Sequence, residues 1–240
     1  MFFSRRQKNI SSRILKTYGL SEAMVKNKLK DVVQRDVSIE TLSHPKGVDI
    51  TLTVEGESNK VVGQIIEAIE EKIRKRLAGY VFGVNGDKME IAVGRALLSN
   101  KKTISVAESC TGGLICHWLT NMPGSSEYFK QGIVAYSNES KTALLNVQGG
   151  TLTKFGAVSQ ETAEAMAAGI KETSGTDIGL AATGIAGPGG GTVEKPVGLV
   201  YIGFADTAGS ISEKHRFKGQ RELIKIQASQ AALDLVRRNL

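Results

Sequence analysis

Residues 103–113 combine a strand-like run with a turn that could carry chemistry. Residues 103–107 alternate and are partly β-branched, which predicts a buried strand, and apolar residues then recur at helical spacing. Ser109 and Thr111 suit the start of that helix, and the two glycines that follow allow a close turn with free amide N–H groups at the positive end of the helix dipole. Such a turn can hold an anion or a developing oxyanion beside a hydroxyl or the thiol of Cys110. A well-capped helix without chemistry explains the same residues equally well.

A polar cluster at residues 136–141 follows a second predicted strand, at residues 133–137, and ends in Lys141. A lysine at a strand-to-helix transition can be partly desolvated, which lowers its pKa and lets the neutral amine act as a general base. On the residues alone, a surface lysine in the first turn of a helix is the simpler interpretation.

A glycine-rich stretch at residues 181–192 comes directly after another predicted strand. Its backbone N–H groups could form a concave anion site, and Thr183, at the strand end, is the side chain best placed to contact a ligand. The stretch is not a phosphate-binding P-loop, because no Gly-Lys-Ser or Gly-Lys-Thr closes it, and it lacks the spaced glycines of a dinucleotide fold. A flexible hairpin between Thr183 and Val197 is the alternative.

The composition limits the classes of function. The 240 residues are 41% hydrophobic and 23% charged, as in an ordinary soluble globular protein, and no run approaches the roughly 18 apolar residues of a membrane span. No apolar segment follows the basic residues at the start, so no secretion signal is expected. Cys110 and Cys116 fit neither a zinc site nor a redox pair, and none of the three histidines has metal-binding neighbours. A reduced, cytoplasmic setting is the expectation.

The net charge of +7 is unevenly spread. Residues 1–35 carry nine Lys or Arg and two acids, whereas residues 36–240 carry 22 of each sign. A basic end can bind nucleic acid. Here the basic residues alternate with apolar ones at helical spacing, Met24 and Val25 among them, so the commoner interpretation is the solvated face of an amphipathic helix.

The N-terminal part, residues 1–85, reads as a small α+β domain. Residues 1–19 form an opening segment without a clear partner, and a helix is predicted from residue 21 to 34. Two strands joined by a turn at residues 44–47 come next, followed by a long helix that ends near Gly79 and a short strand. Residues 85–88 are polar and turn-forming, which marks the boundary.

From residue 86 to 240, predicted strands alternate with helices. This pattern is typical of an α/β fold with a three-layer α/β/α arrangement around a mixed sheet. The main expected elements after the first turn are a helix at residues 159–173, strands at 177–182, 197–205 and 211–217, and a closing helix at 220–240.

Several motifs in this part resemble one family. Ala-Glu-Ser-Cys-Thr-Gly-Gly at 107–113, Tyr-Ser-Asn-Glu-Ser-Lys at 136–141 and Thr-Gly-Ile-Ala-Gly-Pro-Gly-Gly at 183–190 occur in the order and spacing of the CinA C-terminal domain. So do Gly-Ala-Val-Ser at 156–159, Lys-Pro-Val-Gly at 195–198 and Gly-Gln-Arg-Glu at 219–222. Residues 10–85 resemble the KH-like middle domain of that family, without the Gly-x-x-Gly loop of RNA-binding KH domains. The further molybdopterin-binding-like domain of full-length relatives is absent from this sequence, so the pyrophosphatase activity associated with it is not carried over.

The resemblance implies a nicotinamide-nucleotide amidohydrolase, which converts nicotinamide mononucleotide and water to nicotinic acid mononucleotide and ammonia. It assigns the nucleophile to Ser109 and the general base to Lys141, with Tyr136 as a third catalytic residue, and it implies neither metal nor cofactor. The substrate-binding positions that it implies are Glu108, Thr111, Gly112, Gly113, Thr183, Gly184 and Arg221. A homodimer is expected. Binding to nucleic acid or to a membrane is not expected. The alternatives are a nucleotide-binding protein without turnover and a competence-associated protein linked to nucleic acid.

Overall fold

The computed structural model describes residues 8–32 and 36–240. The chain divides into two compact units, Met1–Lys88 and Met89–Leu240, which are described one at a time. Among the described residues, no helix is both long enough and apolar enough to cross a membrane.

The first unit is built on a four-stranded antiparallel sheet with the order β2-β3-β1-β4. The strands are β1 (Asn9–Thr17), β2 (Val37–His44), β3 (Gly47–Gly56) and β4 (Val81–Val84). The expectation that residues 1–19 lack a partner is wrong for β1, which pairs along its whole length with β3 and near its end with β4. Only Leu15 and Thr17 of this strand are fully buried, so its sequence carries little of the alternation that identifies strands.

Two helices accompany this sheet, α1 (Glu22–Leu29) and α2 (Asn59–Arg76). Each begins at a serine whose hydroxyl accepts a hydrogen bond from a backbone N–H three residues later. The buried face of α2 is an apolar stripe at helical spacing, which is why this helix was predictable. Helix α1 ends earlier than predicted, Met24 on it is 48% exposed, and residues 33 and 34 of the predicted helix lie outside the described residues.

The second unit contains a five-stranded mixed sheet with the order β6-β5-β7-β8-β9. Its strands are β5 (Ile104–Glu108), β6 (Phe129–Val134), β7 (Ile178–Gly184), β8 (Leu199–Ala205) and β9 (Ser210–Arg216). Strands β6, β5 and β7 are parallel, whereas β8 and β9 are antiparallel to their neighbours. The strand predicted at residues 133–137 begins and ends earlier, because β6 is an edge strand whose exposed polar residues hide its first half in the sequence.

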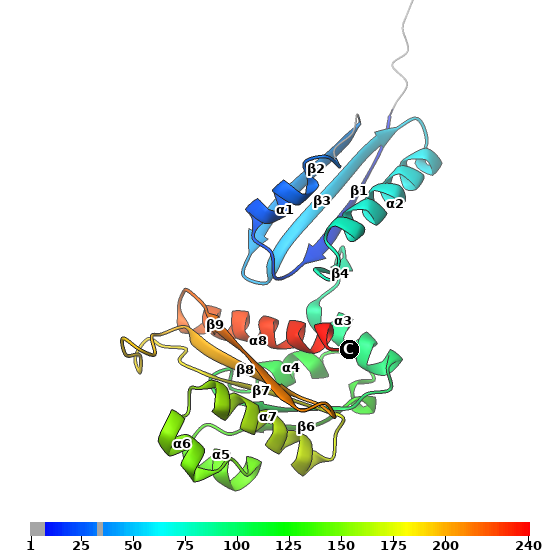
Figure 1. Cartoon of the computed structure of the whole chain (residues 1–240). Helices are drawn as coiled ribbons and strands as arrows, with labels where there is room; N and C mark the ends of the chain where they lie inside the picture. The colour runs from blue at the N-terminus through cyan, green and yellow to red at the C-terminus, as the bar shows by residue number, and fades with distance from the viewer. Residues whose placement is uncertain (1–7, 33–35) are drawn as a thin grey trace, which may run out of the picture. The chain divides into compact units, whose positions relative to one another are not determined.

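Helices cover both faces of this sheet, so the predicted three-layer α/β/α arrangement is confirmed (Figure 1). Helices α3 (Met89–Ser99), α4 (Leu114–Thr120) and α8 (Arg221–Arg238) lie on one face. Helices α5 (Asn138–Leu145), α6 (Gly149–Phe155) and α7 (Gln160–Ser174) lie on the other, and a short 3₁₀ helix, η1, spans Ser125–Glu127. Helix α7 packs directly on the backbone of β7 and β8, because a Cβ atom at Gly179 or Gly203 would collide with carbonyl groups of this helix.

Candidate active site

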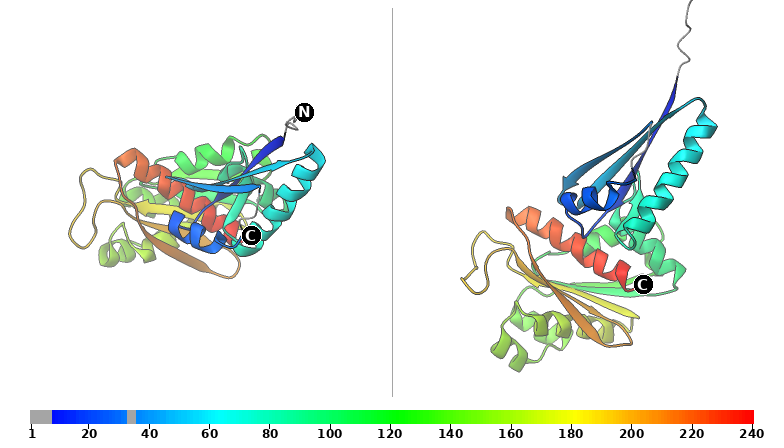
Figure 2. Two further views of the ribbon diagram at one scale, coloured as in Figure 1. Left: turned by 90° about the horizontal axis from the view of Figure 1, so that it is seen from above. Right: turned by 45° about the horizontal axis from the view of Figure 1, so that its top comes forward.

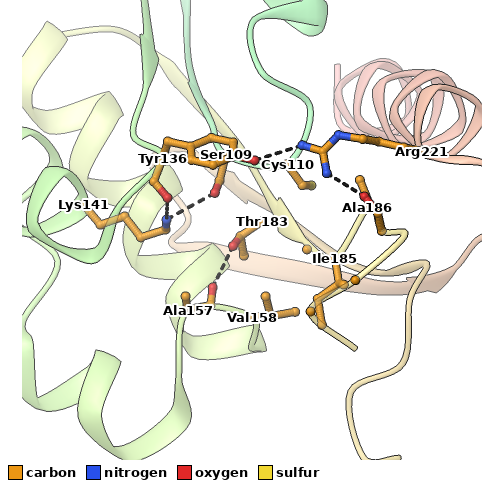
Figure 3. Close-up of a pocket in the computed structure, with 14 residues that line it drawn as sticks. Ser109, Cys110, Tyr136, Lys141, Ala157, Val158, Thr183, Ile185, Ala186 and Arg221 are labelled. Atoms are coloured by element: carbon orange, nitrogen blue, oxygen red, sulfur yellow. Dashed lines mark hydrogen bonds between the residues drawn. The ribbon is translucent and has the colours of Figure 1, made fainter. Parts of the chain in front are cut away.

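The three parallel strands end at the same edge of the sheet, and this edge carries a pocket of about 260 Å³ (Figure 3). Ser109 follows β5, Tyr136 follows β6, and Thr183 is near the end of β7. In open α/β sheets ligands bind beyond the carboxyl ends of the strands, so the topology alone marks this edge. The pocket is lined by Ser109, Cys110, Tyr136, Lys141, Ala157, Val158, Thr183, Gly184, Ile185, Ala186, Gly187, Gly189, Gly190 and Arg221.

Ser109 and Lys141 meet inside this pocket, with 3.2 Å between the serine Oγ and the lysine Nζ. Lys141 lies in the first turn of α5, which begins here because the Ser137 hydroxyl accepts a hydrogen bond from the Ser140 N–H. The amine also donates to the carbonyl oxygens of Ala135 at 3.0 Å and Tyr136 at 3.4 Å. When the amine is neutral, its two N–H groups can serve those carbonyls, and its lone pair is left for the serine hydroxyl.

The environment of Lys141 favours the neutral amine. The side chain is 1% exposed, and burial lowers its pKa from the ordinary value, while the charges of Cys110 and Glu139 act weakly in the opposite direction. A lysine with a lowered pKa, in contact with a hydroxyl, is the arrangement of a general base and its nucleophile. The surface-lysine interpretation of the sequence therefore does not apply to this residue.

Cys110, which directly follows Ser109, is the alternative candidate for an attacking group. It is 6% exposed, and burial, with a contribution from the nearby Glu108 carboxylate, raises the pKa of its thiol to about 12. Because the thiolate is the reactive form, the thiol is a poor nucleophile at neutral pH.

The turn between β5 and α4 differs from the sequence-based expectation. The residue at the N-cap is Gly113, in a left-handed conformation with φ of 94°, and neither Ser109 nor Thr111 caps the helix. Glu108 does so instead: its carboxylate accepts hydrogen bonds from backbone N–H groups of the first turn. Thr111 is fully buried, and its hydroxyl has no partner among the residues that the structure describes.

This turn also changes which backbone N–H groups can contact a ligand. The Gly112 N–H donates to the Ser109 carbonyl at 3.2 Å, and the Gly113 N–H donates to Glu108 at 2.8 Å. Within residues 8–32 and 36–240, by contrast, the N–H groups of Cys110 and Thr111 donate to no other residue. The two glycines therefore shape the turn, and the available donors are the two N–H groups that directly follow the nucleophile.

Arg221, the first residue of α8, connects two segments of the chain at the mouth of the pocket. Its guanidinium donates to the Gly187 carbonyl at 2.7 Å and to the Tyr136 hydroxyl at 2.9 Å (Figure 3). A guanidinium has five N–H donors, so these two bonds fix its plane and leave others for an anion. Tyr136 is 61% exposed, and its contact with Lys141 runs through its backbone carbonyl and not through its hydroxyl.

The loop between β7 and β8 forms the remaining wall, and both views in Figure 2 show it in yellow, extending away from the sheet. Thr183 is buried, and its hydroxyl donates to the Ala157 carbonyl at 2.7 Å. In the described part of the chain, the N–H groups of Ala186, Gly187, Gly189 and Gly190 donate to no other group. Several backbone donors therefore border the pocket, as the anion-site interpretation of this stretch expects.

The pocket thus brings together six of the ten residues expected at the site: Ser109, Tyr136, Lys141, Thr183, Gly184 and Arg221. Glu108, Thr111, Gly112 and Gly113 lie behind it, in the turn that supports the nucleophile. The Ala135 carbonyl was missed, since a backbone group leaves no signal in the residue type. Among the described residues, no three His, Cys, Asp or Glu side chains gather so that they could hold a metal ion.

The fold and the site define a class: a three-layer α/β protein with a buried serine–lysine pair at the carboxyl ends of its parallel strands. Sequence comparison identifies the family. Residues 86–240 match the CinA C-terminal domain, and residues 12–83 match the KH domain of the damage-inducible protein CinA. The chain belongs to the CinA family, and the resemblance seen in its motifs is confirmed.

Named relatives agree with this assignment. A competence-damage inducible protein of Moorella thermoacetica is 45% identical over 240 residues, which are 99% of this chain and 58% of that protein. A CinA-like protein of Kosmotoga olearia is 42% identical, over 95% of this chain and 56% of that protein. The chain therefore spans little more than half the length of these relatives.

Solved structures cover the larger part of the chain. The competence/damage inducible protein CihA from Agrobacterium tumefaciens is 38% identical with a TM-score of 0.60, over 64% of this chain and 98% of that one. A CinA-superfamily protein from Escherichia coli is 28% identical with a TM-score of 0.61, over 63% of this chain and 88% of that one.

Proposed function

We propose that this protein is an amidohydrolase that converts nicotinamide mononucleotide and water to nicotinic acid mononucleotide and ammonia. The observation that carries the proposal is the 3.2 Å contact between Ser109 Oγ and a fully buried Lys141 whose pKa is lowered. A buried amine next to a hydroxyl is expensive to maintain, and acyl transfer is a use that accounts for it. The substrate itself is taken from the family resemblance.

The reaction proceeds in two halves. Neutral Lys141 accepts the Ser109 proton while Oγ attacks the carboxamide carbon, and the resulting ammonium group then protonates the departing nitrogen, so that ammonia leaves and an ester remains on Ser109. In the second half Lys141 accepts a proton from water, and the hydroxide attacks the ester. The proton returns to Oγ as the carboxylic acid leaves, and the acid then loses its own proton to solvent to give the carboxylate.

The pocket offers a binding group for each part of this substrate. The N–H groups of Cys110 and Thr111 follow the nucleophile directly and serve as the oxyanion donors, in place of the glycines expected from the sequence. The remaining Arg221 N–H groups and the loop N–H groups bind the phosphate. The side chains of Ala157, Val158 and Ile185 provide apolar surface for the pyridine ring.

The experiment is an assay of ammonia release from nicotinamide mononucleotide. Ser109→Ala and Lys141→Ala are expected to lower kcat by about 10³-fold or more, because each removes one half of the nucleophile–base unit. Cys110→Ser is the matched control and should keep most of the activity, since its thiol stays protonated. Full activity in either alanine variant, or no ammonia release by the wild type, would refute the proposal.

A further inference from the structure

Glu108 is a buried charged group that the proposed reaction does not use. It is the last residue of β5, directly before the nucleophile, and its side chain is 0% exposed. The carboxylate accepts hydrogen bonds from the N–H groups of Gly113 at 2.8 Å, Ile115 at 3.2 Å and Cys116 at 2.8 Å. Both carboxylate oxygens are engaged, and Glu108 does not line the pocket.

No cation compensates this carboxylate: in the described part of the chain, Glu108 forms no ion pair with a lysine, arginine or histidine. Burying a carboxylate is costly unless its hydrogen-bonding capacity is met, and here the three backbone N–H groups meet it. Without the carboxylate, those three N–H groups at the start of α4, one of them buried and two part-buried, would lose this acceptor. A carboxylate can serve all three N–H groups, because both of its oxygens are acceptors.

The hydrogen bonds that Glu108 accepts join the two ends of a short segment of chain. This segment contains Ser109 and its neighbours in the turn. The carboxylate of one residue reaches the backbone five, seven and eight residues further on, and Ser109 is enclosed between them. Cys110 and Thr111, whose N–H groups donate to no other described residue, lie in the same enclosed segment. The left-handed φ values of Gly112, 62°, and Gly113, 94°, permit the path that this closure requires.

We propose that Glu108 is a positioning residue for acyl transfer: it holds the turn at residues 109–113 so that Ser109 Oγ and the N–H groups of Cys110 and Thr111 converge on one carbonyl group. This inference rests on the proposed function. It replaces the substrate-binding role expected for Glu108, because the side chain faces the helix start and not the pocket.

The test compares Glu108→Ala and Glu108→Gln with variants of Asp177. Asp177 also accepts a backbone N–H bond, from Thr103 at 2.8 Å, but it precedes β7, at the opposite end of the strands from the pocket. Asp177→Ala and Asp177→Asn therefore remove a carboxylate–backbone contact from the same sheet without touching the turn.

Glu108→Ala is expected to lower kcat for ammonia release by about 100-fold or more, the effect of losing an aligned oxyanion donor, while KM stays within about twofold. Glu108→Gln keeps the shape and one acceptor oxygen for Gly113 and Ile115, so its kcat should fall between those of Glu108→Ala and the wild type. The Asp177 variants should keep kcat within about twofold. Melting temperatures identify variants that are simply unfolded, and the glutamine variant then carries the comparison.

A kcat of Glu108→Ala within about threefold of the wild type would overturn the inference. So would an equal loss of kcat in Asp177→Ala, or a loss expressed wholly in KM. The rate at which p-nitrophenyl acetate acylates Ser109 separates this inference from the proposed function. If the wild type is acylated but releases no ammonia from the nucleotide, the proposed function fails, and a slower acylation of Glu108→Gln still supports the positioning role.

Discussion

At the scale of single residues, Lys141 combines two conflicting demands. It is buried, which favours the neutral amine, and it is surrounded by oxygen atoms of Ser109, Ala135 and Tyr136, which can accept its protons. Burial is the larger effect, so the pKa lies below the ordinary value of 10.5. A base of this kind stays protonated, and inactive, at low pH.

The expected consequence is a rate that rises with pH. kcat should increase about tenfold per pH unit below the lowered pKa of Lys141 and level off above it, because only the neutral amine accepts the serine proton. Lys141→Arg should be inactive across the whole range, since a guanidinium stays protonated. A pH–rate profile of the wild type checks this prediction. A rate that falls as the pH rises from about 6 to about 8 would contradict the lysine base.

The contacts of Tyr136 favour a role in binding over the catalytic role expected for it. Its hydroxyl contacts Arg221, and its carbonyl contacts Lys141. Tyr136→Phe removes only the hydroxyl contact, a solvent-exposed hydrogen bond from the guanidinium that contributes about 0.5–1.5 kcal/mol. KM for the nucleotide should therefore rise about 2- to 12-fold with little change in kcat.

Nicotinamide riboside, which lacks the phosphate, provides the control for this variant. In the proposed function Tyr136 acts on the phosphate through Arg221, so Tyr136→Phe should leave kcat/KM for the riboside nearly unchanged. Steady-state kinetics with both substrates measure the difference. A large fall in kcat with either substrate would mean that the tyrosine hydroxyl takes part in the chemistry.

At the scale of elements, local patterns in the sequence predicted most of the helices and strands but not all of their ends. Helix α2 was predictable because its buried isoleucines recur at helical spacing, and β7 because nearly every residue in it is apolar or small. Strands β1 and β6 were missed or misplaced because exposed polar residues interrupt their alternation. The capping residue of α4 was predicted wrongly. A glutamate five residues before the N-cap position, Gly113, lies outside the usual N-cap pattern.

The site, like the elements, could be predicted only in part. The motifs containing Ser109, Lys141 and Thr183 each follow a predicted strand, but the residues alone left each motif open, and only the family resemblance assigned them to one site. The contact between Arg221 and Tyr136 spans 85 residues and depends on the order of the strands, which no local pattern contains. The proposed oxyanion donors could not be predicted from the sequence either, because only the geometry of the turn decides which backbone N–H groups already have an acceptor.

At the scale of the whole molecule, the two units have separate hydrophobic cores and separate sheets. Every residue that lines the pocket belongs to the second unit, Met89–Leu240. The CihA structure from Agrobacterium tumefaciens matches 64% of this chain, and the match covers 98% of CihA itself. A related protein about as long as the second unit therefore folds without a further domain.

A fragment of residues 86–240 is accordingly expected to fold and to release ammonia with a kcat within about twofold of the whole chain. Circular dichroism and the melting temperature establish that the fragment is folded, and the ammonia assay measures its rate. A folded fragment without activity would show that the KH unit contributes to catalysis. Residues 8–88 expressed alone are the control and should have no activity.

The Arg221 contacts at the pocket mouth have a consequence for folding. They join three segments that are 34 and 85 residues apart in the chain, so their formation requires that β6, β5, β7 and β8 already hold their final order. Contacts of such sequence separation carry a large loop-closure entropy and form late. A collapsed intermediate with native helices but incomplete strand pairing would lack the Arg221 contacts that form the mouth of the pocket. Binding of the proposed anionic substrate would therefore report the completion of folding in this unit, and a refolding experiment should regain it only after the helical signal has returned.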